Sequence, residues 1–435
     1  MTQLTFIILG GAGDLTRRLL LPGLAQYVAI DDTLEVSIIG VGYQPEEDYP
    51  TQVAGALTDA HIPSDVVKKV VAATSWVTAD ATSADDLGKL LSGREGRNIV
   101  YFALSPAITK KTVDALATVD LPAGMEFALE KPFGTDADTA RALTEALYKF
   151  TDEDHIVRSD HFLGMSGTVN LGGLLETNRP LADTWDGRDV ESLTFVFDET
   201  LGLEGRAQFY DATGAARDML QSHLIQAMAH SLADPADGPS GAAKILAATS
   251  LEGDVTVAAR RARYTSGSIQ GHTLPDYTAE QGVDASRNTE TLAEVKLSVD
   301  TDDWRGVPIT LRSGKAIGDP RQEITVHYKP VGDAHGTTLR LGFDDDAVLM
   351  EINISDPGHP ENLQRATFHT HLMPSKLSAY GRVVRGLVRQ TGATELHADS
   401  PVRAWEILQP VFAAFADGSV PLEEYPAGSG GPTGW

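Results

Sequence analysis

The chain has 435 residues, of which 42% are hydrophobic and 22% charged, and this length exceeds what one hydrophobic core usually serves. Its formal net charge of −26 excludes non-specific binding to nucleic acid or anionic membranes, and the absence of cysteine excludes disulfides, thiolate metal sites and cysteine nucleophiles. With no long apolar run and no basic signal start, we expect a cytoplasmic two-domain protein without nucleic acid or membrane partners.

The first element of the chain is a strand that leads into a glycine-rich turn. Leu4–Leu9 is a short apolar run of strand-forming residues, and Gly10-Gly11-Ala12-Gly13-Asp14-Leu15 follows at once. A helical pattern begins near Thr16. Backbone amides at such a helix N-terminus can hold a pyrophosphate, so the turn predicts a dinucleotide site although its spacing departs from GxGxxG.

Apolar strands alternate with helical patterns up to about residue 160. The segments 36–40, 98–104 and 125–129 have the composition of buried strands, and a further strand leads into Arg158. This alternation predicts a doubly wound parallel sheet of the Rossmann type, which binds its ligand at the carboxyl ends of the strands. Glu130-Lys131-Pro132-Phe133-Gly134 lies at such an end. We assign residues 1–160 to this α/β dinucleotide-binding domain.

Strands without intervening helices dominate after about residue 165. This pattern predicts an α+β domain with a large, mostly antiparallel sheet at residues 161–435, for substrate binding and oligomerisation. The alternating segments are 190–200, 290–299, 307–312, 323–328, 337–343 and 348–354. We expect helices on one face of the sheet, including one that carries His223 and others near 376–388 and 401–415, and a loop or tail at 427–432.

A histidine and a carboxylate supply the candidate chemistry. His223 ends the stretch Arg217-Asp218-Met219-Leu220-Gln221-Ser222-His223, and Asp160 opens Asp160-His161-Phe162-Leu163-Gly164. An imidazole with an unperturbed pKa of about 6.5 works as a base near neutral pH when a carboxylate orients it. We therefore interpret His223 as a catalytic base and Asp160 as its carboxylate partner.

Motifs along nearly the whole chain resemble those of the glucose-6-phosphate dehydrogenase family. They fall in the family's order, and several are five residues or longer, so chance agreement is negligible. The motifs are Gly-Gly-Ala-Gly-Asp-Leu at 10–15, Glu-Lys-Pro-Phe-Gly at 130–134, Asp-His-Phe-Leu-Gly at 160–164, Glu-Gly-Arg at 204–206, Tyr-Asp-Ala-Thr-Gly at 210–214, Arg-Asp-Met-Leu-Gln-Ser-His at 217–223, Thr-Glu-Thr at 289–291, Arg-Ser-Gly-Lys at 312–315 and Tyr-Pro-Ala-Gly-Ser at 425–429.

The resemblance implies oxidation of C1 of a hexopyranose, glucose 6-phosphate or a related sugar, to the lactone with hydride transfer to a nicotinamide cofactor. By the same resemblance, His223 removes the C1 hydroxyl proton and Asp160 orients it. Asp218 and Glu199 resemble acids that bind sugar hydroxyls. His161 and Lys315 resemble donors to the phosphate end of the substrate. Lys131 resembles a lysine that touches both sugar and cofactor. Members of the family assemble through the antiparallel sheet, which implies a homodimer or homotetramer.

Four positions depart from the family's pattern. Met165 stands where a lysine usually follows the leucine-glycine of the phosphate motif, and Leu19 replaces the third cation of the helix after the glycine turn. Phe162 replaces a tyrosine and Ser222 an asparagine. A charged hydrogen bond to phosphate contributes about 1.5–3 kcal/mol, so the two missing cations predict weaker or altered phosphate binding.

The end of the second strand indicates NAD in preference to NADP. A 2′-phosphate needs a cation there, where the family usually has an arginine and this chain has Gly42-Tyr43-Gln44. Ala12 replaces a hydroxyl residue of the family's turn, and no Lys or Arg occurs between Arg18 and Lys68. The acidic stretch Glu46-Glu47-Asp48 would repel a phosphate. A cation from a remote segment is the arrangement that would overturn this preference.

Three functions stay open. The first is an NAD-dependent sugar 1-dehydrogenase, and the second is a dehydrogenase of an unphosphorylated or differently charged sugar, which Met165 and Leu19 favour. The third is a non-catalytic nucleotide-binding regulator, which the presence of both His223 and Asp160 disfavours.

His369 and His371 occupy alternate positions and would share one side of a strand. With no carboxylate at suggestive spacing, they predict a polar sheet face, and we expect no metal site.

Overall fold

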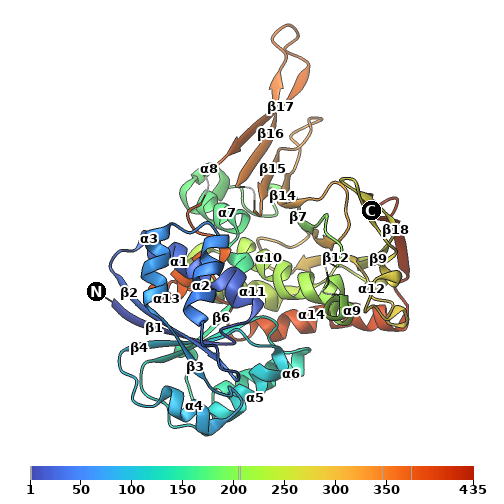
Figure 1. The fold of residues 1–435 in the computed structure, drawn as a ribbon. Coiled ribbons are helices and arrows are strands. Elements are labelled where there is room, and N and C mark those ends of the chain that lie inside the picture. Colours follow the sequence, from blue (N-terminus) through green and yellow to red (C-terminus); the bar gives the residue numbers. More distant parts are fainter. Residues whose placement is uncertain (1, 204, 206, 345, 374) are drawn as a thin grey trace. The chain divides into compact units, whose positions relative to one another are not determined.

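The computed structural model describes residues 2–203, 205, 207–344, 346–373 and 375–435. The chain divides into two compact units, which we call the first unit (1–164 with 375–402) and the second unit (165–374 with 403–435). Figure 1 shows the course of the chain through both. In the described part of the chain, no helix combines the length and apolarity needed to cross a lipid bilayer.

The first unit is built on a parallel sheet that, among the described residues, has six strands in the order β3-β2-β1-β4-β5-β6 (Figure 1). Phe6, Ile7, Ile8 and Leu9 of β1 are all fully buried, as expected for a central strand covered on both faces. The strands are β1 (Thr2–Leu9), β2 (Leu34–Gly42), β3 (Thr74–Thr78), β4 (Arg97–Phe102), β5 (Met125–Glu130) and β6 (Ile156–Ser159).

Helices cover both faces of this sheet and create two hydrophobic cores. Phe6 and Ile8 point into the core with Leu24 of α1, whereas Ile7 and Leu9 point into the core with Leu116 of α5. The helical elements are η1 (Thr16–Leu20), α1 (Leu21–Ile30), α2 (Tyr49–Asp59), α3 (Ser64–Ala72), α4 (Ala84–Leu91), α5 (Pro106–Leu116), α6 (Ala137–Leu147), η2 (Glu153–His155), η3 (His161–Gly164) and α13 (Ala379–Arg389). The doubly wound arrangement predicted from the sequence is thus confirmed.

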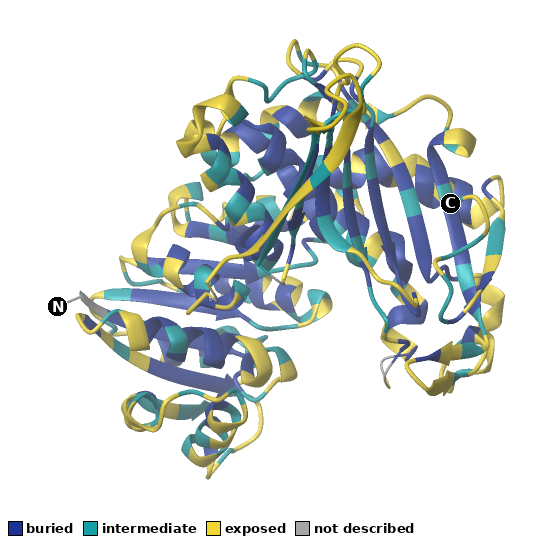
Figure 2. Cartoon of the chain, turned by 90° about the horizontal axis from the view of Figure 1, so that it is seen from above, coloured by how far each residue is buried: buried dark blue, intermediate teal, exposed yellow. Residues whose placement is uncertain are grey.

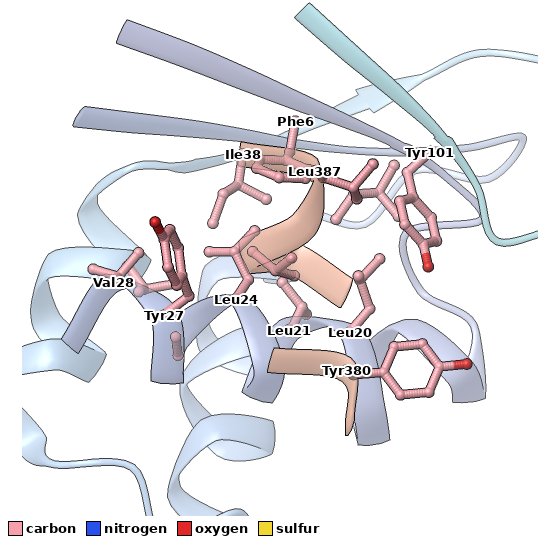
Figure 3. Packing of buried hydrophobic residues seen from close by; sticks show 14 of the residues in the cluster. Phe6, Leu20, Leu21, Leu24, Tyr27, Val28, Ile38, Tyr101, Tyr380 and Leu387 are labelled. Atoms are coloured by element: carbon pink, nitrogen blue, oxygen red, sulfur yellow. The ribbon is translucent and has the colours of Figure 1, made fainter. Parts of the chain in front are cut away.

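Helix α13 lies in a different place from the one the sequence predicted. The helix expected near 376–388 packs on α1 in the first unit, and does not cover the antiparallel sheet. Figure 3 shows Leu387 and Tyr380 beside Leu21 and Leu24 of the same core. Gly23 permits the close approach of the two helices, because a Cβ there would lie 2.7 Å from the backbone of residues 380 and 381.

The second unit is built on a large mixed sheet, with ten strands among the described residues. The strand order is β17-β16-β15-β14-β7-β13-β12-β9-β18, and β8 pairs with β12. The pairs β13–β7 and β18–β9 are parallel and the others antiparallel, which confirms the predicted mostly antiparallel sheet. The strands are β7 (Val190–Asp198), β8 (Thr249–Leu251), β9 (Ala259–Thr265), β12 (Leu292–Val299), β13 (Ile309–Gly314), β14 (Gln322–Tyr328), β15 (Thr338–Gly342), β16 (Ala347–Ser355), β17 (Leu363–His371) and β18 (Leu422–Pro426), beside a separate hairpin of β10 (Gly267–Ile269) and β11 (His272–Leu274).

Burial in the second unit is strongest at the centre of the sheet. The central strands are mostly buried, whereas the edge hairpin of β16 and β17 extends from the sheet, with β16 partly buried and β17 largely exposed (Figures 1 and 2). Helix η4 packs on β13 and β12, and α7 packs on β15. The helical elements are α7 (Ser166–Thr177), α8 (Arg179–Ala182), α9 (Ala207–Ala215), η4 (Ala216–Leu224), α10 (Ile225–Leu232), η5 (Pro235–Asp237), α11 (Gly238–Ala248), α12 (Val255–Ala258), η6 (Tyr277–Ala279), η7 (Ala285–Arg287) and α14 (Ser400–Asp417).

Candidate active site

The glycine turn after β1 is held by backbone contacts that leave no room for a side chain at Gly10 or Gly11. Gly10 has φ +86°, and a Cβ on it would lie 2.3 Å from the Ala103 carbonyl oxygen. A Cβ on Gly11 would lie 2.6 Å from the Cα of Gly40. The Gly13 N–H donates to the Gly10 carbonyl at 2.9 Å and closes the turn. The N–H groups of the helix that starts at Thr16 are therefore presented at the carboxyl end of the sheet, where a pyrophosphate binds in this fold.

Tyr49 and Trp76, which the sequence analysis did not select, pack next to this turn and the end of β2. The Tyr49 hydroxyl donates to the Gly11 carbonyl at 3.0 Å, and its ring packs on Trp76 with centroids 4.7 Å apart. Trp76 in turn donates its indole N–H to the Gln44 carbonyl at 3.1 Å. A Cβ on Gly42 would lie 2.8 Å from the Trp76 ring, so this glycine belongs to the same packing.

A cavity of about 530 Å³ opens beside the turn, across the carboxyl ends of the central strands. Tyr43 lines it and is 77% exposed. Glu46 also lines the cavity and accepts a hydrogen bond from Gln52 Nε2 at 2.7 Å. Lys111 of α5 lines it as well, so the cavity does contain a cation from a remote segment.

Lys131 follows β5 at the same end of the sheet and is joined to Pro132 by a cis peptide bond. Its neighbour Glu130, which the sequence analysis did not select, accepts a hydrogen bond from Tyr101, and a second comes from Tyr380 of α13. Desolvation raises the pKa of Glu130 to about 7, and the Asp160 carboxylate adds to the rise. These contacts identify a protonatable acid close to both Lys131 and Asp160.

Asp160 and His161 stand at the start of η3, directly after β6. Asp160 is fully buried, and its Oδ1 accepts the Phe162 N–H at 3.0 Å. Its own N–H donates to the Thr394 carbonyl at 3.1 Å. The His161 ring stacks on Tyr380, with centroids 5.0 Å apart and planes at 22°. The segment 375–402 thus fixes the orientation of both candidate residues.

In the second unit, η4 carries Asp218 and His223, and a buried glutamate fixes its start. Oε1 of Glu290 accepts the Ala216 N–H at 3.0 Å. Gly214, with φ +70°, turns the chain just before, and a Cβ there would lie 2.4 Å from Oε1 of Glu290. His223 is 1% exposed, and the helix that carries it packs on β13 and β12 of the large sheet.

Lys315 and Glu199 meet directly. Lys315 Nζ donates to Glu199 Oε2 at 2.5 Å, and the ammonium lies 5.2 Å from the centroid of the Tyr210 ring. Burial raises the pKa of Tyr210 far above its usual range, and the carboxylates of Glu290, Asp218 and Glu199 are further causes. The structure therefore brings Lys315, Glu199 and Asp218 together around Tyr210.

The departures from the family pattern have distinct environments. Met165 is 7% exposed and directly precedes α7. Leu19 is exposed on η1, and Phe162 is buried. The Ser222 hydroxyl donates to the Arg217 carbonyl at 3.0 Å, so it serves the helix backbone.

The candidate residues fall into two groups. The first unit holds the glycine turn with Tyr43, Lys131, Asp160 and His161, and the second unit holds Glu199, Asp218, His223 and Lys315. Asp160 and His223 belong to different units, so their pairing stays a prediction, as do the assigned roles. Glu204 and Arg206 of the Glu-Gly-Arg motif lie outside the described residues.

Comparison with known protein families covers almost the whole chain. Residues 7–170 match the NAD-binding domain of glucose-6-phosphate dehydrogenase, and residues 174–435 match its C-terminal domain. The chain belongs to the glucose-6-phosphate dehydrogenase family. The resemblance inferred from the motifs is thereby confirmed.

Curated relatives and solved structures agree with this family. The glucose-6-phosphate 1-dehydrogenase of Gluconobacter oxydans is 30% identical over 462 aligned residues, which cover 98% of this chain and 94% of that protein. The crystal structure of glucose-6-phosphate 1-dehydrogenase from Mycobacterium avium matches with a TM-score of 0.84 at 26% identity, covering 98% of this chain and 94% of the other. A glucose-6-phosphate dehydrogenase in complex with glucose 6-phosphate has a TM-score of 0.90 at 23% identity, covering 100% and 96%, and shows the shared fold.

Proposed function

We propose that this member of the glucose-6-phosphate dehydrogenase family oxidises C1 of glucose 6-phosphate to the lactone and transfers hydride to a nicotinamide dinucleotide. The observation that carries the proposal is the match to both family domains along nearly the whole chain, together with the presence of His223 and Asp160. The Lys315–Glu199 pair supplies both a donor and an acceptor for a polar sugar.

The proposed step moves one proton and one hydride. His223 takes the proton of the C1 hydroxyl while the C1–H bond breaks. The hydrogen of that bond leaves with the bonding electron pair, as a hydride, for the nicotinamide ring, and C1 becomes a carbonyl carbon. Asp160 orients the imidazole and stabilises the imidazolium that forms. Asp218 and Glu199 accept hydrogen bonds from sugar hydroxyls, His161 and Lys315 donate to the phosphate, and Lys131 touches both sugar and cofactor. A bound nicotinamide supplies the hydride acceptor.

We propose NAD in preference to NADP. Tyr43 stands at the end of β2 where a 2′-phosphate would need a cation, and Glu46 lines the same cavity. Like charges about 4 Å apart repel by about 1 kcal/mol in bulk water and about 4 kcal/mol near a protein surface, enough for a preference of several-fold or more. Lys111 opposes this preference, but the charge of Asp80 compensates it in the same cavity.

The test is the initial rate of nicotinamide reduction with glucose 6-phosphate or glucose against NAD or NADP. We expect turnover with glucose 6-phosphate and a higher kcat/KM for NAD than for NADP. A clear preference for NADP contradicts the cofactor proposal, and absence of turnover with both sugars contradicts the substrate proposal. His223→Ala should abolish turnover and leave NADH affinity within twofold, whereas a nucleotide-binding regulator would lose nothing.

A second candidate is oxidation of an unphosphorylated or differently charged sugar. Met165 and Leu19 favour it, because they replace two cations at the expected phosphate end. Under this alternative, glucose would match or exceed glucose 6-phosphate in kcat/KM.

We also propose that the protein is a homodimer or homotetramer assembled through the second unit. The large sheet supports this, because β17 is an edge strand with exposed Leu363 and Phe368. Light scattering of the native protein gives the mass, and a monomer at micromolar concentration would contradict the proposal.

A further inference from the structure

The dinucleotide cavity extends well beyond the glycine turn. Its lining follows the carboxyl ends of four neighbouring strands, from Leu104 after β4, past the turn after β1 and Tyr43 after β2, to Asp80 after β3. In this fold the pyrophosphate lies at the glycine turn and the adenosine ribose at the end of the second strand. The base therefore falls in the remaining part of the cavity, between the loop after β3 and helix α5.

That part of the cavity is lined mainly by apolar side chains, and its polar members are Asp80, Thr82 and Lys111. Ala79, Ala81, Leu104 and Ile108 offer flat apolar contact of the kind that a purine ring needs. Lys111 follows Ile108 by three positions on α5, and this spacing puts both side chains on the same face of the helix. Asp80 follows β3, so it lines the cavity from the side opposite to α5, with β2 and β1 between them in the strand order.

Asp80 is held in a fixed position. Its Oδ1 accepts the backbone N–H of Thr82 at 2.8 Å and the Thr82 hydroxyl at 2.7 Å. Its own N–H donates to Oδ2 of Asp86 at 3.0 Å. The hydrogen bonds from Thr82 hold the pKa of Asp80 below its usual range, and the charge of Lys111 adds to this effect. Asp80 is thus an acceptor that stays ionised, and its Oδ2 is the oxygen left for a ligand.

We propose that Asp80 and Lys111 recognise the edge of the adenine base, which makes them specificity-determining residues for the cofactor. Adenine offers a donor at its exocyclic amine and acceptors at its ring nitrogens. A carboxylate only accepts and an ammonium only donates, so the two side chains complement that edge. The inference rests on the proposed dinucleotide-dependent function and extends it to the base.

The charges in the cavity favour a neutral base over a phosphate beside Lys111. Asp80 and Glu46 both line the cavity with Lys111, so its described charged side chains carry one net negative charge. A dianionic 2′-phosphate would meet this net repulsion, whereas adenine, which is uncharged, would not.

The experiment compares NAD with nicotinamide hypoxanthine dinucleotide, in which a carbonyl replaces the exocyclic amine and the adjacent ring nitrogen N1 carries a hydrogen. The measurements are KM and kcat with saturating glucose 6-phosphate. The wild type should show about a tenfold higher KM for the hypoxanthine analogue at equal kcat. Asp80→Asn should bring the two KM values within about twofold, because an amide can donate to the carbonyl as well as accept from the amine. Lys111→Met should raise KM for both dinucleotides about fivefold.

Two neighbouring residues give matched controls. Lys110 lies beside Lys111 on α5 but pairs with Asp114 at 2.7 Å, and Asp85 is exposed on α4; neither lines the cavity. Lys110→Met and Asp85→Asn should leave both KM values and their ratio unchanged. An unchanged ratio in Asp80→Asn overturns the proposal. A Lys111→Met variant that loses affinity for NADP alone also overturns it and assigns Lys111 to a 2′-phosphate.

Direct binding separates this inference from the proposed reaction. Calorimetric titration of the full chain with NADH and with the reduced hypoxanthine analogue needs no sugar, so the base preference remains measurable if no sugar is turned over. Equal affinity of the wild type for both dinucleotides refutes recognition of the base, whichever sugar is the substrate. Thermal unfolding of Asp80→Asn checks that the Thr82 contacts keep the loop folded.

Discussion

Substitution of Lys315 by methionine tests the ion pair at the centre of the second unit. The side chains of Lys315 and Glu199 are only 9% and 21% exposed, and their charged atoms lie 2.5 Å apart. Breaking a buried pair from one side costs about 3–5 kcal/mol, because the remaining charge stays desolvated. Since Glu199 keeps a fifth of its exposure, we expect Lys315→Met to lower the free energy of unfolding by about 2–3 kcal/mol.

This loss should be visible in thermal unfolding measured without sugar. For a unit of 150–250 residues, each kcal/mol shifts Tm by about 2–4 °C, so the expected fall is about 4–12 °C. The double variant Lys315→Met/Glu199→Gln should recover about half of it, because the uncompensated carboxylate is gone. Recovery stays partial, since the contact between the ammonium and the Tyr210 ring is lost in both variants.

The matched control is Lys296→Met, at an exposed lysine of β12, which should change stability by less than about 0.5 kcal/mol. A Lys315→Met protein with the Tm of the wild type would refute the reasoning. So would a double variant no more stable than the single one, because the cost would then arise from packing and not from the isolated charge.

Three further predictions concern the first unit. The folded pKa of Glu130, about 7, exceeds an unfolded value of about 4.3, so its contribution to stability is present at low pH and lost as the pH rises through this window. In urea titrations, the unfolding free energy of Glu130→Gln should therefore exceed that of the wild type by about 2–3 kcal/mol at pH 8 and by little at pH 4.5. An equal difference at both pH values would contradict this. Gly11→Ala should weaken NADH binding at least tenfold in calorimetry, because its Cβ would meet backbone atoms that cannot move. The control Gly55→Ala on α2, which has open space around it, should bind NADH normally and raise the free energy of unfolding by about 0.5–1 kcal/mol. Equal NADH affinities of the two variants would refute the packing argument. Tyr43→Arg should raise the ratio of kcat/KM for NADP over NAD at least tenfold and Tyr43→Phe should not; an unchanged ratio in the arginine variant would place the 2′ position elsewhere.

The parallel strands of the first unit were predictable because central strands are covered on both faces and so carry uninterrupted apolar runs. The segments predicted at 36–40, 98–104 and 125–129 correspond to β2, β4 and β5. Strand β3 was not predicted. It is an edge strand with no buried residue in Thr74–Thr78, so its sequence lacks the apolar run that marks its neighbours.

Helix α13 shows a limit of a different kind. Its apolar stripe indicates that one face of the helix is buried, but it does not indicate which element covers that face. The helix lies in the chain between segments of the second unit, so sequence order suggested the large sheet as its partner. The contacts with α1 that place it in the first unit depend on Gly23, more than 350 positions away, whose lack of a side chain has no visible link to α13 in the sequence.

The candidate site residues could be selected one by one from the sequence, but the contacts between them could not. Lys315 and Glu199 were selected separately, and the parallel pairing of β7 with β13, which joins Asp198 to Gly314, is what brings them together. Lys111 was not selected from the sequence, because this cation of the cavity comes from the helix after β4 and not from the end of β2.

The pairing of Lys315 with Glu199 bears directly on the missing cations. A phosphate that binds Lys315 has to share its ammonium with Glu199 or displace that carboxylate, so the charge available to the phosphate is smaller than a free lysine would offer. Met165 and Leu19 leave fewer cations to compensate, in a chain with a net charge of −26. The hydroxyl contacts proposed for Glu199 and Asp218 should then contribute more to sugar binding than the phosphate does. The ratio of kcat/KM between glucose 6-phosphate and glucose measures this balance, and Lys315→Met should reduce the ratio while a Glu199→Gln variant, which frees the ammonium, should increase it.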